Sequence, residues 1–83
     1  MTSDSEALLD CTVLDGHFGP ERLVSIDTVD GTEQVPVSGT FLVNSKLRVS
    51  PIAARNSQLL VELPSESVSG KWRVWVKREH LEN

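Results

Sequence analysis

The stretch of sequence that decides the fold is residues 21–37, which read ERLVSIDTV-DG-TEQVPV. On both sides of Asp30-Gly31, β-branched residues alternate with polar ones, as they do in a strand with one buried face. The dipeptide Asp-Gly supplies the positive φ angles of a two-residue type I′ turn. The sequence therefore predicts a β-hairpin with Asp30 and Gly31 at its turn.

This turn would also fix the register of the hairpin. Two apolar pairs then face each other on one side, Ile26 opposite Val35 and Val24 opposite Val37. The same register places Pro36 opposite Ser25 at a hydrogen-bonded position, where proline has no N–H to donate. We therefore expect the ladder to break or bulge at Pro36, or the strand to lie at the edge of a sheet.

The rest of the chain also favours strands over helices. Eleven valines stand against three alanines, and β-branched residues, glycine or proline interrupt the longer segments. Four further strands are expected, at 41–43, 46–52, 58–63 and 71–77. A second hairpin turn is expected at Asn44-Ser45, and Pro51 is expected to close the strand that follows it.

Residues 8–14 allow two interpretations. Leu9, Cys11 and Val13 alternate as in a strand, whereas Ser3 and Glu6 have the spacing of a helix capping box. We favour the strand, because Cys11 and Val13 are poor helix formers.

The strand expected at 71–77 has two distinct faces, because successive side chains in a strand point in opposite directions. One face carries Trp72, Val74 and Val76, and the other carries Lys71, Arg73, Trp75 and Lys77. We expect the first set to lie in the core, together with Val13, Val24, Ile26, Val35, Val37, Phe41, Val49, Leu59 and Val61. The second set then forms an outer surface.

The chain has 83 residues, of which 39 % are hydrophobic, enough for one small domain with a modest core. We expect residues 1–6 to be a disordered acidic leader and residues 7–83 to form the single domain. No apolar run approaches the roughly 18 residues of a membrane span, and the acidic N-terminus is unlike a secretory signal. A soluble cytoplasmic protein without a membrane partner is therefore expected.

The charges are distributed unevenly along the chain. Residues 1–42 hold eight acidic residues and one basic residue, a net charge of −7, whereas residues 43–83 hold seven basic and four acidic residues, a net charge of +3. Either the two halves neutralise each other in the folded domain, or the basic half has an anionic partner.

Five or six short strands leave open edges unless the sheet closes, so a small antiparallel barrel is expected. Residues 7–11, ALLDC, resemble the Ala-Leu-Tyr-Asp-Tyr opening of Src-homology-3 domains, and residues 76–82, VKREHLE, resemble their closing Val-Pro-Ser-Asn-Tyr-Val-Glu. The resemblance implies an Src-homology-3-like barrel. It does not imply that family's binding of proline-rich peptides between aromatic rings. The chain has no tyrosine, and the matching positions hold Leu9, Cys11, His80 and, in place of the proline, Lys77.

The sequence contains few groups that could carry catalysis. Phosphate-binding glycine loops, His-Glu-x-x-His and Gly-x-Ser-x-Gly do not occur in it. His17 and His80 are its only histidines, and Cys11, its only cysteine, alternates with apolar residues as a small buried side chain does. We therefore expect no enzyme, no cofactor and no metal site.

The most informative surface is the outer face of the last strand. Trp75 lies there between Arg73 and Lys77. Lys71 and Arg48 are further candidates for the same binding surface. Full burial of a tryptophan contributes roughly 4–6 kcal/mol, so leaving one in water needs a reason.

Three explanations for this tryptophan compete. Another part of the chain covers it, a protein partner or a second copy binds it, or the bases of single-stranded nucleic acid stack on it. We favour a non-catalytic protein-interaction module, with weak single-stranded nucleic-acid binding as the alternative, because one tryptophan and a net charge of −4 suit nucleic acid poorly.

Overall fold

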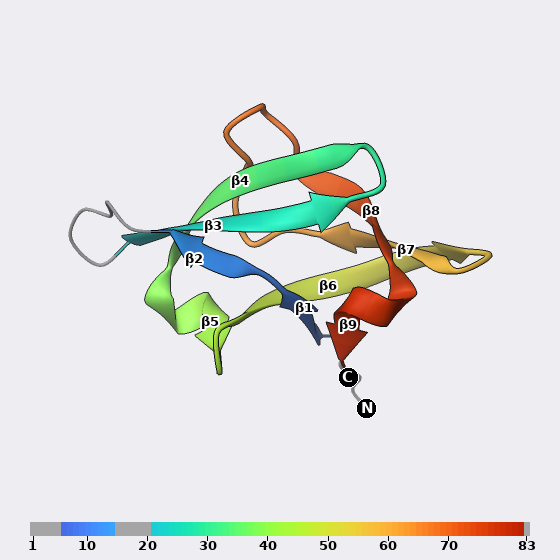
Figure 1. The fold of residues 1–83 in the computed structure, drawn as a ribbon, viewed down its shortest axis with the longest axis horizontal. Coiled ribbons are helices and arrows are strands. Elements are labelled where there is room, and N and C mark those ends of the chain that lie inside the picture. Colours follow the sequence, from blue (N-terminus) through green and yellow to red (C-terminus); the bar gives the residue numbers. More distant parts are fainter. Residues whose placement is uncertain (1–5, 15–20, 83) are drawn as a thin grey trace.

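The structure, a computed structural model, describes residues 6–14 and 21–82 (Figure 1). These residues form strands and two short 3-10 helices: β1 (Ala7–Asp10), β2 (Thr12–Leu14), β3 (Glu21–Thr28), β4 (Gly31–Ser38), η1 (Gly39–Phe41), β5 (Leu42–Val43), β6 (Lys46–Arg55), β7 (Gln58–Glu62), β8 (Arg73–Lys77), η2 (Arg78–His80) and β9 (Leu81–Glu82). No α-helix occurs in these two ranges. The predicted all-β class is confirmed.

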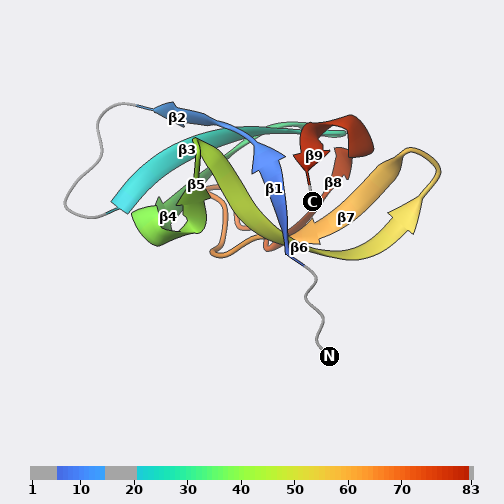
Figure 2. The same cartoon turned by 90° about the horizontal axis from the view of Figure 1, so that it is seen from below.

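The strands form two antiparallel sheets that face each other (Figure 2). One sheet has the order β8-β7-β6-β1-β9, with β5 beside β6, and the other has the order β2-β3-β4. Both sheets contribute to one core, which consists of Leu9, Val24, Ile26, Val35, Val37, Leu47, Val49, Val61, Leu63, Val74 and Val76. Within the described ranges, strand pairing does not close the sheets into a barrel. The backbone link between β8 and the β3–β4 turn is a hydrogen bond from Val29 N to Trp75 O at 2.9 Å.

The β3–β4 hairpin forms where the sequence predicts it, but the predicted register is wrong. Thr28 pairs with Gly31, so Val29 and Asp30 make the turn. Neither turn residue has a positive φ; Gly31 takes it instead, at 124°. The Thr28 hydroxyl stabilises this turn by accepting a hydrogen bond from Asp30 N at 3.1 Å and donating one to Gly31 O at 2.7 Å.

The corrected register leaves the predicted faces of the hairpin unchanged. Val24 pairs with Val35 and Ile26 with Glu33, which shifts every partner by two residues from the expected pairing. Because side chains in a strand alternate with a period of two, a two-residue shift keeps the same residues inside. Val24, Ile26, Val35 and Val37 are all buried as expected.

Pro36 lies opposite Leu23, not Ser25, on a strand that forms the edge of its sheet. The expectation of an edge strand is therefore confirmed. The loop between β7 and β8 covers this edge. Val68 N donates to Gln34 O at 2.8 Å, and the Ser65 hydroxyl donates to Pro36 O.

The hairpin around Asn44-Ser45 is confirmed. Both residues have positive φ, 54° and 66°, and β5 pairs with β6 across them. Pro51 does not close the second strand, because the pairing of β6 with β7 shifts between Pro51 and Ala53 and then continues to Arg55. An irregularity of this kind lets a strand accept a proline without ending.

The strand interpretation of residues 8–14 is confirmed, and the helix alternative is wrong. The chain leaves one sheet at Asp10 and enters the other at Thr12, so Cys11 lies between two short strands. Ser3, on which the capping-box alternative depended, lies outside the described residues.

Most of the predicted core is confirmed, and three predictions are wrong. Val49, Val61, Val74 and Val76 are buried, like the hairpin residues above, and Leu59 is partly buried against the core. Val13, Phe41 and Trp72 are exposed by 39 %, 37 % and 51 %. Val13 lies on the edge strand β2, Phe41 lies in η1, and Trp72 precedes β8, so neighbouring strands do not enclose them.

Candidate functional site

Strand β8 places Arg73, Trp75 and Lys77 on its outer face and buries Val74 and Val76. The predicted alternation is confirmed for residues 73–77, whereas Lys71 and Trp72 precede the strand. On the neighbouring strand β7, Glu62 lies opposite Arg73, Leu60 opposite Trp75 and Gln58 opposite Lys77. We call the surface formed by Arg55, Gln58, Leu60, Arg73, Trp75 and Lys77 the Trp75 face.

Arg55, which lies over the Trp75 ring, is not among the residues predicted from the sequence. The Arg55 Cζ atom is 4.0 Å from the centroid of the indole, and Arg55 Nε donates to Gln58 Oε1 at 3.0 Å. Arg55 reaches this position because β6 continues past Pro51. The sequence signal that could have placed Arg55 at the end of a strand is Asn56-Ser57, the same dipeptide that forms the β5–β6 turn. Asn56 has a φ of 47°, and the strand ends directly before it, at Arg55.

The charged side chains beside Trp75 are exposed. Arg73 Nη2 lies 3.7 Å from Glu62 Oε2, with the two side chains 60 % and 44 % exposed. An ion pair this exposed contributes little to folding, about 0–1 kcal/mol. Lys77 forms no ion pair with any described residue. Part of the positive charge of this face is therefore available to a partner.

Two predicted binding residues lie apart from the Trp75 face. Lys71 Nζ is 3.7 Å from Glu33 Oε2 on β4, and Glu33 Oε1 also accepts a hydrogen bond from Ser69 at 2.7 Å. The hydrogen bond from Ser69, and to a lesser degree the charge of Lys71, lowers the pKa of Glu33. Arg48 lies on β6 beside Leu8 of β1. The structure thus brings together Arg73, Trp75 and Lys77, whereas Lys71 pairs with Glu33 and Arg48 lines a separate small pocket with Glu62, the ion-pair partner of Arg73.

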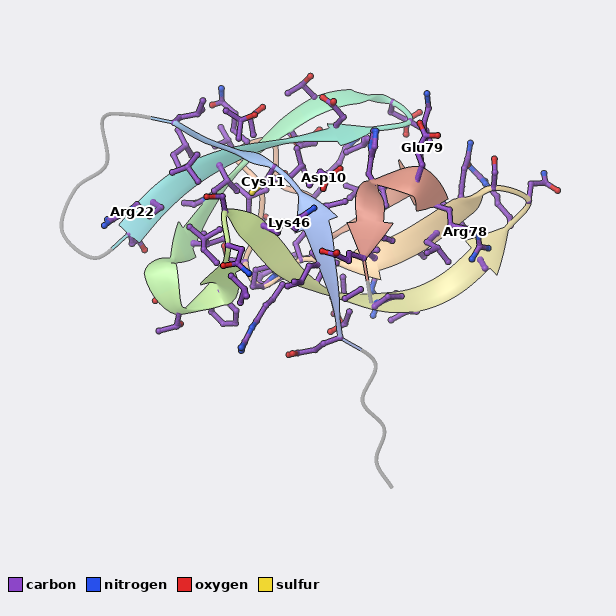
Figure 3. All side chains as sticks on the ribbon, turned by 60° about the horizontal axis from the view of Figure 1, so that its bottom comes forward. Asp10, Cys11, Arg22, Lys46, Arg78 and Glu79 are labelled. Atoms are coloured by element: carbon purple, nitrogen blue, oxygen red, sulfur yellow. The ribbon has the colours of Figure 1, made fainter. Side chains whose placement is uncertain are left out.

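A groove lies beside the β6–β7 turn, at the end of the Trp75 face. It has a volume of about 370 Å³ and is lined by Ser57, Gln58, Lys77, Arg78 and Glu79. Arg78 N donates to Ser57 O at 2.9 Å, which fixes the start of η2 against the turn. Figure 3 shows Arg78 next to the β6–β7 hairpin. The groove therefore continues the Trp75 face toward η2.

Cys11 and His80 line a second, half-open pocket of about 210 Å³, with Asp10, Thr12, Ser25 and Asp27. The Cys11 thiol donates to Ser45 O at 3.3 Å. Burial, reinforced by the charge of Asp10, raises the pKa of Cys11. The group that His80 Nε2 faces is Glu79 Oε2, at 3.9 Å. A nucleophilic cysteine needs a lowered pKa and a nearby base, whereas burial shifts the pKa of this thiol in the opposite direction.

Asp10 is engaged by Lys46 at the mouth of this pocket (Figure 3). Lys46 Nζ donates to Asp10 Oδ1 at 2.5 Å and lies 3.8 Å from Glu82 Oε1. The hydrogen bond to Asp10 raises the pKa of Lys46. Across residues 6–14 and 21–82, no three His, Cys, Asp or Glu side chains come together as metal ligands would. His17 lies outside these residues.

In the part of the chain that the structure describes, no helix has the length and apolar character that a membrane crossing requires.

Comparisons of the chain with protein-family models, with curated proteins and with solved structures found no match.

Proposed function

We propose that this protein is a non-catalytic protein-interaction module and that the Trp75 face is its contact surface. The observation that carries the proposal is the stack of Arg55 on Trp75, with Arg73 and Lys77 beside it. Tryptophan and arginine are the residues whose truncation most often weakens protein interfaces. A stack that holds both in place reduces the side-chain entropy lost on binding.

The contact surface is the guanidinium–indole pair together with the strand surface around it. Trp75 is of intermediate exposure and Arg55 covers one side of its ring, so a partner meets less bare indole than a fully exposed ring would offer. Arg55 is itself exposed. Its outer surface is the part on which a partner's apolar, aromatic or anionic groups bind.

A second copy of the chain is one candidate partner, because its acidic N-terminal half complements the basic C-terminal half in charge. A mass measurement in solution at several concentrations distinguishes a dimer from a monomer that binds another protein.

Weak binding of single-stranded nucleic acid through the same face is the alternative proposal. An aromatic ring flanked by cations supports it, and the net charge of −4 opposes it. Titration with an oligothymidylate at low and high salt decides between them. No affinity at low salt removes the alternative.

The absence of catalysis and the cytoplasmic location belong to the same proposal. The raised pKa of Cys11 and its hydrogen bond to a carbonyl support a structural role for this thiol. With a single cysteine, the fold uses no internal disulfide, which suits a reducing compartment.

We also propose an Src-homology-3-like architecture. The two segments that carry the resemblance lie side by side, because β1 pairs with β9 and places Leu8 opposite Glu82 and Leu9 opposite Leu81. An opening and a closing segment in contact are what such a resemblance requires.

The experiment that tests the proposed function compares the full chain with Trp75→Ala and with the matched control Trp72→Ala. Each of the three chains is immobilised, and the proteins that bind to each chain are identified. A partner retained by the wild type and by the control, but lost with Trp75→Ala, is the expected result. Identical sets of bound proteins on all three chains would remove the Trp75 face from the interaction.

A further inference from the structure

Three cations with no carboxylate partner in residues 6–14 and 21–82 lie at one end of the Trp75 face. Arg55 ends β6, Lys77 ends β8 and Arg78 begins η2. Among the described residues none of the three forms an ion pair, whereas Lys71 and Arg73 each form one and Lys46 forms two.

The strand register brings these cations together. Gln58 of β7 pairs with Arg55 on one side and with Lys77 on the other, so the three residues form a row across the sheet. Arg78 follows Lys77 directly and lines the same groove. Positive charges near one another repel, so an anion bound among Arg55, Lys77 and Arg78 is attracted by all three.

Arg55 is already held in a geometry suited to a carboxylate. Its ring contact with Trp75 and its Nε hydrogen bond to Gln58 fix the plane of the guanidinium. No hydrogen bond occupies its two terminal nitrogens within the described ranges. Planar N–H groups of arginine pair with both oxygens of a carboxylate, and a fixed guanidinium loses less entropy in doing so.

The groove beside these cations offers space next to the Trp75 face. Its volume is about 370 Å³, and Ser57 and Gln58 line it together with Lys77, Arg78 and Glu79. Among the described residues of this lining, Glu79 is the single acid. The balance of charge around the groove and Arg55 is therefore three cations to one anion.

We propose that this groove and the Trp75 face bind an extended acidic peptide segment of a protein partner. Its aspartate or glutamate carboxylates lie among Arg55, Lys77 and Arg78, and an apolar side chain of the peptide packs against the Arg55–Trp75 pair. This inference rests on the proposed function, because it names the partner class for the same face.

The test uses two fluorescein-labelled peptides, one of alternating glutamate and leucine and one in which glutamine replaces every glutamate. The wild-type chain is expected to bind the glutamate peptide at least about tenfold more tightly, with affinity that falls as salt rises. Arg78→Glu is expected to weaken this binding by about tenfold or more, because it reverses a charge in the groove. Arg48→Glu makes the same charge change beside β1 and is expected to leave the affinity within about twofold.

Each outcome decides a different point. Equal affinity for the two peptides, or equal losses from the two charge reversals, overturns the acidic-peptide assignment and leaves the proposed function standing. No binding of either peptide also overturns it, as does tighter binding of an oligothymidylate than of the glutamate peptide. Circular dichroism verifies folding of each variant, and Lys77→Gln with Arg78→Gln replaces Arg78→Glu if that chain does not fold. The proposed function is tested by a different experiment, the loss of protein partners in Trp75→Ala. Failure of the peptide assignment and failure of the proposed function can therefore be distinguished.

Discussion

The guanidinium of Arg55 lies over the indole of Trp75, with 4.0 Å between the Arg55 Cζ atom and the ring centroid. The two residues come from β6 and β8, which are separated in the sheet by β7. Gln58, on the strand between them, accepts the Arg55 Nε–H. A contact that crosses a strand in this way connects the stability of the β6–β7 hairpin to the exposure of Trp75.

Removal of Arg55 is expected to uncover Trp75. In a Trp72→Phe background, where Trp75 is the only tryptophan, Arg55→Ala shifts the emission to longer wavelength and increases quenching by acrylamide. The loss of the cation–π contact lowers the free energy of unfolding by about 0.5–1 kcal/mol. Arg55→Lys serves as the control that keeps the charge but not the planar group. Unchanged emission in Arg55→Ala would contradict the observation that Arg55 covers the Trp75 ring.

Gly31 is expected to be the critical residue of the β3–β4 turn. A Cβ atom at this position meets nothing within 4 Å, so the cost of Gly31→Ala comes from its φ of 124° and not from a clash. We expect a loss of about 1–2 kcal/mol in the free energy of unfolding, measured in urea. Asp30→Ala changes the neighbouring turn residue, which has no positive φ, and is expected to cost much less. Similar losses in both variants would support the Asp30-Gly31 turn instead.

Glu33 accepts a hydrogen bond from Ser69 and forms an ion pair with Lys71. We expect these contacts to make the free energy of unfolding decrease at acidic pH. Because the folded-state pKa of Glu33 lies below its ordinary value of 4.5, the stabilisation is complete above that value and is lost as the pH falls through the lower folded-state pKa. Ser69→Ala removes the principal cause of this shift and is expected to cost about 1 kcal/mol at neutral pH. Urea unfolding at stepwise lower pH measures both effects.

Glu33→Gln is the matched control for the contacts of Glu33 with Ser69 and Lys71, since a glutamine side chain does not titrate. Its unfolding curve is expected to lose the part of the pH dependence that wild type shows below pH 4.5. If the wild type and Glu33→Gln lose stability in parallel over that range, Glu33 does not carry the effect.

Cys11 is expected to react slowly with alkylating reagents at neutral pH. Burial raises its pKa above the ordinary 9.0, so the reactive thiolate is scarce until the pH exceeds that value. The alkylation rate of the folded chain, followed by mass spectrometry and compared with the urea-unfolded chain, is expected to be lower and to rise at higher pH. A folded chain that reacts faster than the unfolded chain would restore Cys11 as a candidate nucleophile.

Leu47 and Trp72 are expected to differ sharply in their effect on stability. Leu47 is fully buried in the core, and Leu47→Ala is expected to cost about 2–5 kcal/mol. Trp72 is 51 % exposed, and Trp72→Phe is expected to change the free energy of unfolding by about 0.5 kcal/mol or less. Thermal unfolding of the two variants checks the difference. A large decrease in the free energy of unfolding of Trp72→Phe would indicate that Trp72 is part of the core.

Local patterns predicted the candidate site in part. Alternation along β8 was sufficient to place Arg73, Trp75 and Lys77 on one outer face, because that geometry depends only on neighbouring residues in one strand. The same alternation gave Trp72 an inward orientation, yet nothing local indicated that the core ends before it. Lys71 was grouped with the site for the same reason, although its partner Glu33 comes from another sheet.

The sequence by itself determined the strands and, within most of them, the inward and outward side chains. Period-two alternation and turn residues such as Asn44-Ser45 are properties of adjacent residues, so they are visible without a partner strand. Only the tertiary structure decided the register of β3 with β4, since a shift of two residues leaves the inner face unchanged. It also decided the stack of Arg55 on Trp75, the cross-strand row of Arg55, Gln58 and Lys77, and the groove that Lys77 and Arg78 line. Those relationships depend on how β6, β7 and β8 lie beside one another, and residues distant in the chain acquire them only when the strands pair.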